Sequence, residues 1–129
     1  MDAASNLKEQ LKEIDDRIAE LEKDIEIGKA LERLHENEDF QKVILDGYLE
    51  DEAKRLFELM TTPMKFKREI MENIQEKLSS IRNLKEYFAV KLQNAGFAQE
   101  QIEEEKEYRK DVTEANSQEM KLIEGGEDE

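Results

Sequence analysis

Cysteine and tryptophan are absent from this 129-residue chain, and proline occurs only once. Without cysteine the chain can form no disulfide and no thiolate metal site, which fits a reducing compartment. One proline and five glycines leave few helix breaks, and aromatic residues make up only 6% of the chain. These shortages exclude a disulfide-stapled scaffold and a thick globular core, and the composition predicts long helices without strands.

Charged residues are plentiful, at 42% of the chain against 37% hydrophobic, and the formal net charge is −14. A chain of this length has room for one domain, whose apolar material would form a thin layer shared between long helices or between associated copies. The negative charge argues against direct nucleic-acid binding and against anionic membranes, because both present phosphate. We therefore expect protein partners, and basic partners in particular.

The N-terminus and the hydropathy pattern predict a soluble protein made in a cytoplasm. The first ten residues contain no basic start followed by an apolar run, so no signal peptide is predicted. No segment reaches the length of a membrane span.

An apolar seam with heptad spacing is predicted in the N-terminal region. A helix is expected to begin at Ser5 or Asn6, whose side chains can cap its first turn. Apolar residues then alternate at steps of four and three, namely Leu7, Leu11, Ile14, Ile18, Leu21 and Ile25. This spacing is typical of a coiled-coil helix, and also of an amphipathic helix that packs against its own chain.

The densest apolar segment follows a polar break. Asn37 is expected to cap a new helix, with Glu38 and Asp39 in its electropositive first turn. Between Phe40 and Met60 the apolar residues cover much of the helix circumference, so this helix should be the most buried. Gly47 would let the backbone of another element approach closely. The predicted core or partner-binding residues are Phe40, Ile44, Tyr48, Leu49, Leu56, Phe57 and Phe66.

A turn at residues 61–63 is predicted to start a third helix, because Pro63 suits the first helical position. Apolar residues then recur every three or four positions from Phe66 to Leu92, which predicts a long helix packed back along the first. Gly96 offers the left-handed residue that commonly ends a helix.

Beyond Gly96 the chain becomes acidic and weakly patterned. We expect a half-exposed helix to about Ala115 and then a disordered end. The predicted fold is thus all-α: an elongated helical hairpin or bundle over residues 1–98 with an N-terminal coiled-coil arm, followed by an acidic, partly helical to disordered tail over residues 99–129.

Patterns for catalysis or metal binding are weak. Glu32 and His35 have the Glu-x-x-His spacing of di-iron carboxylate bundles, but such a site needs two motifs and the chain has one histidine. A surface histidine near a helix end is the simpler interpretation. Without cysteine there is no Cys-His nucleophilic pair, and no glycine-rich phosphate loop is present. We predict no enzymatic activity, no cofactor and no metal.

A small basic cluster stands at the predicted start of the third helix. Lys65, Lys67 and Arg68 surround Phe66, and basic residues there oppose the helix dipole. Pairing with acidic stretches of this chain or its neighbours is therefore a better interpretation than nucleic-acid contact.

The segment from Ala30 to Met60, roughly a quarter of the chain, carries a recognisable pattern. Its most characteristic residues are Asn37, Asp39, Phe40, Gly47, Tyr48, Glu52, Ala53 and Leu56. In this segment the chain resembles small all-helical proteins of tailed bacteriophages, of the virion-assembly or structural kind. The resemblance implies a phage protein that acts in the host cytoplasm and can be incorporated in the virion.

The leading hypothesis is a non-enzymatic phage structural or assembly protein that acts through helix–helix interactions with itself or with other virion proteins. The alternatives are an acidic nucleic-acid mimic that inhibits a host enzyme through residues 100–129, and a scaffolding or chaperone-like coiled coil. Deletion of residues 100–129 is expected to abolish binding by an inhibitor and to spare the fold of a structural protein.

Overall fold

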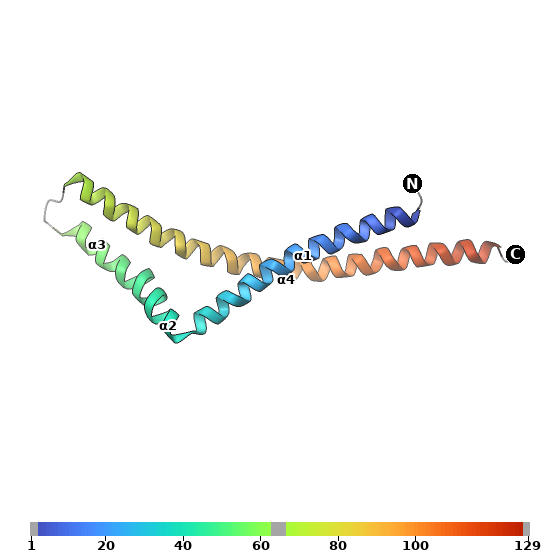
Figure 1. The fold of residues 1–129 in the computed structure, drawn as a ribbon, viewed down its shortest axis with the longest axis horizontal. Helices are drawn as coiled ribbons and strands as arrows, with labels where there is room; N and C mark the ends of the chain where they lie inside the picture. The colour runs from blue at the N-terminus through green and yellow to red at the C-terminus, as the bar shows by residue number, and fades with distance from the viewer. Residues whose placement is uncertain (1–2, 63–66, 128–129) are drawn as a thin grey trace. The chain divides into compact units, whose positions relative to one another are not determined.

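The computed structural model describes the backbone of residues 3–62 and 67–127, and the side chains of these ranges as far as Gln118. Every element in the described part of the chain is a helix (Figure 1). The prediction of an all-α fold is confirmed. In chain order the helices are α1 (Ala3–Glu36), α2 (Glu38–Phe40), the π-helix η1 (Gln41–Glu52), α3 (Ala53–Thr61) and α4 (Arg68–Glu127).

The chain divides into two compact units. The first unit joins Met1–Glu26 to Ala95–Glu129, and the second unit is the intervening segment Ile27–Asn94. The long helices α1 and α4 each contribute to both units.

The first unit is an antiparallel pair of helices, formed by the beginning of α1 and the end of α4. Nε of Arg17 donates a hydrogen bond to Glu105 over 3.0 Å, and Nε of Arg109 donates one to Asp15 over 2.8 Å. The later α1 residue thus pairs with the earlier α4 residue, which fixes the antiparallel orientation. Both pairs are partly exposed to solvent, so they select the register more than they stabilise the unit.

The heptad seam of α1 lies on the inside of this helix pair. Ile14 is 1% exposed, and the other five seam residues are half-buried. On α4 the inward positions also recur at steps of four and three, and they are small, apolar or charged: Ala95, Ala98, Ile102, Glu105, Arg109, Val112 and Asn116. The N-terminal seam therefore packs against the chain's own α4.

The predicted helix end at Gly96 is wrong. Helix α4 continues from Arg68 through Gly96 to Glu127, and no glycine in the described ranges has a positive φ. The reason is packing on both sides: Ala95 and Ala98 are buried at 7% and 1% exposure, so the helical face continues through the glycine. The predicted boundary between residues 98 and 99 falls inside this helix.

The second unit is built around a hairpin, in which η1 and α3 pack on the first half of α4. Its buried core consists of Leu49, Leu56, Ile74 and Ile81, which are 1–5% exposed. Leu78, Leu84 and Phe88 of α4 pack against this core. The apolar face predicted to pack along the first helix thus packs on η1 and α3 instead. Residues 63–66, including Pro63 and Phe66, lie outside the described residues.

Asn37 separates α1 from the helices of this hairpin. Its backbone is extended, and its side-chain oxygen accepts a hydrogen bond from the backbone N–H of Phe40 over 2.9 Å. This is an N-cap, as the sequence predicts, and Glu38 and Asp39 occupy the first turn behind it.

The π-helix η1 explains how such a broad apolar segment packs on a single neighbour. Helices of this kind rarely exceed one turn, whereas η1 has 12 residues. Apolar residues recur here four and five positions apart, as Ile44, Leu45, Tyr48, Leu49 and then Ala53 at the start of α3. At 3.6 residues per turn they would spread over about half of the circumference. The wider π turns bring them onto a narrower face: Leu49 belongs to the core cluster, and the other four pack against it.

Candidate functional site

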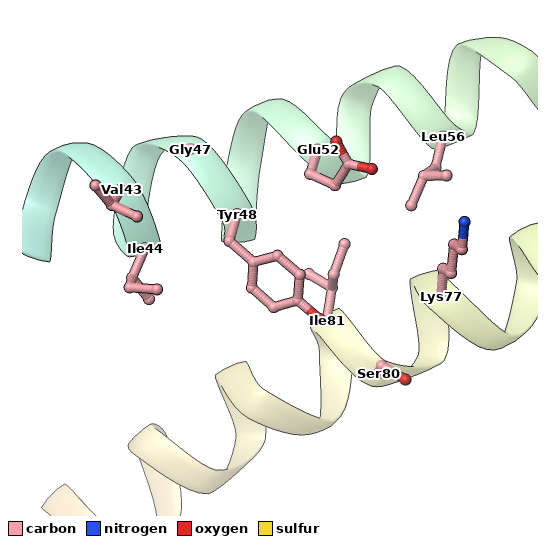
Figure 2. A pocket seen from close by; sticks show the side chains of 9 residues that line it. All are labelled: Val43, Ile44, Gly47, Tyr48, Glu52, Leu56, Lys77, Ser80 and Ile81. Carbon is pink, nitrogen blue, oxygen red and sulfur yellow. The ribbon is translucent and has the colours of Figure 1, made fainter.

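An open groove of about 650 Å³ runs between η1–α3 and α4 in the second unit (Figure 2). We call it the hairpin groove. The lining residues are Val43, Ile44, Gly47, Tyr48, Glu52 and Leu56 on one wall and Lys77, Ser80 and Ile81 on the other.

The floor of the hairpin groove is apolar and is fixed by the core beneath it. Leu56 and Ile81 are 1% and 3% exposed, and both belong to the core cluster. Tyr48 points from η1 toward Ile81 across the groove (Figure 2). At the rim, Val43 is 63% exposed. The groove thus presents a rigid apolar floor next to apolar surface that is open to solvent.

One carboxylate of the groove is held in place by an arginine. Nε of Arg55 donates to one oxygen of Glu52 over 3.0 Å, and Nη2 donates to the other oxygen. This bidentate hydrogen bond lowers the pKa of Glu52 below its ordinary value, and the positive charge of Lys77 also lowers it. Glu52 therefore stays ionised at the groove wall.

Gly47 faces a backbone atom of its own helix. A Cβ added at this position would stand 2.9 Å from the carbonyl oxygen of Lys42, five residues earlier. The expectation that Gly47 admits the backbone of another element is wrong, because the close atom belongs to the preceding turn of η1. A Cβ would fit here only if that backbone shifted, so this position favours glycine.

Substitution of Gly47 by alanine is expected to destabilise the protein by about 1–3 kcal/mol, as overpacking commonly does. The matched control is Gly96→Ala in α4, where an added Cβ would meet no atom within 4 Å. That variant should gain up to about 1 kcal/mol, because alanine favours a helix interior over glycine. Urea denaturation followed by circular dichroism measures both. If Gly47→Ala were as stable as Gly96→Ala, the steric role of Gly47 would be refuted.

The predicted interaction residues are only partly brought together. Ile44, Tyr48 and Leu56 line the hairpin groove, and Leu49 belongs to the buried core. Phe57, expected in the core or in a partner-binding surface, is 60% exposed and lies outside the core. Its position is the outward one next to Leu56, which faces the core. Sequence reasoning missed Val43 as a lining residue, and it placed no groove wall on α4, although Ile81 belongs to the apolar spacing noted there.

Phe40 belongs to an aromatic cluster with His35 and Phe88. The ring centroid of His35 lies 5.7 Å from each phenylalanine ring, and the two phenylalanine rings are 6.0 Å apart. Nδ1 of His35 lies 2.7 Å from the carbonyl oxygen of Leu31. The half-buried His35 is therefore a packing residue and not the surface histidine expected. Within residues 3–62 and 67–118, no group of three or more histidine, aspartate or glutamate side chains is placed to hold a metal ion.

No family model, curated protein or solved structure matches the chain. Among the described residues, no helix is both long enough and apolar enough to span a membrane.

Proposed function

We propose that the chain is a non-enzymatic structural or assembly protein of a tailed bacteriophage, which acts in the host cytoplasm by binding helices of other proteins. The observation that carries this proposal is the hairpin groove, with its apolar floor and the 63%-exposed Val43 at its rim.

A helix is the occupant that best suits such a surface. An amphipathic helix places apolar residues three, four and seven positions apart along one face, and such faces bind in hydrophobic grooves between helices. Each large apolar side chain that becomes fully buried contributes about 1.5–3 kcal/mol. Two or three such side chains against Val43, Ile44 and Tyr48 would therefore offset a useful part of the entropic cost of association.

The assignment to a phage rests on the resemblance of Ala30–Met60 to small virion-assembly proteins. This segment supplies η1 and most of α3, and therefore one whole wall of the hairpin groove. An N-terminal coiled-coil arm belongs to the same proposal, and the heptad spacing on both helices of the first unit supports it. A scaffolding role would use the same surfaces and differs only in whether the protein leaves the finished particle.

The test is deletion of the coding sequence in the phage that carries it, followed by a count of infectious particles. An assembly protein should be required, so the yield should fall by a large factor and return when the wild-type chain is supplied from a plasmid. A plasmid that encodes the Val43→Gln variant, changed at an exposed groove residue, should restore a lower yield of infectious particles than one that encodes Val90→Gln. Val90 is 47% exposed and does not line the groove. Normal particles from the deletion mutant would refute the proposal.

A second candidate function is supported by the acidic face of α4. Glu100, Glu103, Glu104 and Glu107 are exposed on a continuous helix, so they form the ordered array of charges that a nucleic-acid mimic needs. An inhibitor of this kind would act on a host enzyme and would leave particle assembly intact. The deletion experiment therefore separates the two functions, because only a structural or assembly protein is needed to build the particle.

A further inference from the structure

The helices α2 and η1 are strongly acidic, and η1 forms part of one wall of the hairpin groove. Between Glu38 and Glu52 the chain carries six carboxylates and one basic residue, Lys42. Five of the carboxylates are exposed, and the sixth, Glu52, is half-buried. Among the side chains described in residues 3–62 and 67–118, none forms an ion pair with Asp46, Glu50 or Asp51, whereas Glu52 is bound by Arg55. Of these six carboxylates only Glu52 lines the groove, and the other five are exposed on α2 and η1 outside its lining.

The opposite wall does not cancel this charge. Its lining residues are Lys77, Ser80 and Ile81, so it offers one cation against the six carboxylates of α2 and η1. The free cation of the groove, Lys77, faces the Arg55-bound Glu52 and not the stretch from Asp46 to Asp51.

We propose that the occupant of the hairpin groove is a basic amphipathic helix of another protein. This inference rests on the proposed function and narrows it to a partner chemistry. Apolar residues along one face of that helix would bury Val43, Ile44 and Tyr48, and flanking lysines or arginines would approach the carboxylates of η1. Such charge complementarity speeds association and excludes acidic partners. A second copy of this chain is a poor occupant, because each copy carries a net charge of −14.

The experiment measures binding of three dye-labelled synthetic peptides of about five helical turns to the full-length protein by fluorescence anisotropy. The first peptide has a leucine stripe at helical spacing flanked by lysines. The second has the same leucine stripe flanked by glutamates. The third has the amino-acid composition of the first peptide, but its leucines are scrambled so that they form no stripe. The first should bind at least about tenfold more tightly than either of the others, with an advantage over the glutamate peptide that shrinks as salt rises.

Two sets of variants locate the binding site. Val43→Gln should weaken binding of the first peptide several-fold, whereas Val90→Gln, exposed on α4 away from the groove, should not. Both side chains are exposed, so neither change threatens the fold. The combined change Asp46→Asn, Glu50→Gln and Asp51→Asn should reduce the preference for the lysine peptide over the glutamate peptide.

Each other outcome overturns the inference. Equal binding of the scrambled peptide would show charge attraction without a groove, and equal or tighter binding of the glutamate peptide would refute the basic partner. Failure of all three peptides to bind would refute the helix as occupant. A dimer that Val43→Gln dissociates would assign the groove to a second copy. The peptide experiments and the phage deletion test different points. The inference can fail in the peptide experiments while the deletion mutant still shows that the protein is needed for assembly.

Discussion

Replacement of Leu56 by alanine is expected to lower the free energy of unfolding of the second unit by about 2–5 kcal/mol. Leu56 is 1% exposed and is one of the two largest fully buried side chains in the described part of the chain. It packs in the core with Leu49, Ile74 and Ile81, and it also forms the groove floor. Truncation leaves a cavity that rigid helical neighbours fill only in part. Urea denaturation followed by far-UV circular dichroism measures the loss.

The adjacent residue provides the matched control. Phe57 loses more atoms than Leu56 on mutation to alanine, but it is 60% exposed. Phe57→Ala should therefore change stability by no more than about 0.5 kcal/mol, as surface substitutions usually do. If Phe57→Ala proved as damaging as Leu56→Ala, the orientation of α3 against α4 would be wrong.

Removal of residues 100–129 is expected to unfold the first unit, because α4 covers the seam of α1. The deletion takes away Ile102, Glu105 and Arg109, and with them the ion pairs to Arg17 and Asp15. The large apolar residues from Leu7 to Ile25 would then face water. Hydrogen exchange of the α1 amides should accelerate by at least about tenfold, since helices of this kind depend on tertiary packing.

A shorter truncation controls for the loss of chain length and charge. Removal of residues 119–129 leaves Val112 and Asn116 in place opposite the start of α1, so exchange in Leu7–Ile25 should stay close to that of the full chain. Unchanged exchange after the longer deletion would show that α1 does not depend on α4. The longer deletion is also no clean test of an inhibitor, contrary to the expectation from sequence, because it removes structural contacts together with the acidic residues.

Local chemistry was enough to establish several features of this protein. A composition rich in helix formers with one proline predicts the all-α fold, and Asn37 caps a helix through a hydrogen bond within three residues of itself. The inward face of the first helix also follows from spacing alone, because Leu7 through Ile25 recur at the period of a helix.

The partner of each apolar face was decided only by the tertiary structure. The spacing of Leu7–Ile25 is the same whether the seam meets another chain or, as found, the end of α4. Gly96 favours a helix end locally, but α4 continues past it because Ala95 and Ala98 on either side are buried. In η1, Ile44, Tyr48 and Leu49 all pack in or against the core that η1 shares with α4. The hairpin groove itself joins side chains more than thirty residues apart along the sequence, such as Tyr48 and Ile81. Sequence periodicity shows which face of a helix is apolar, but long-range packing determines what that face meets.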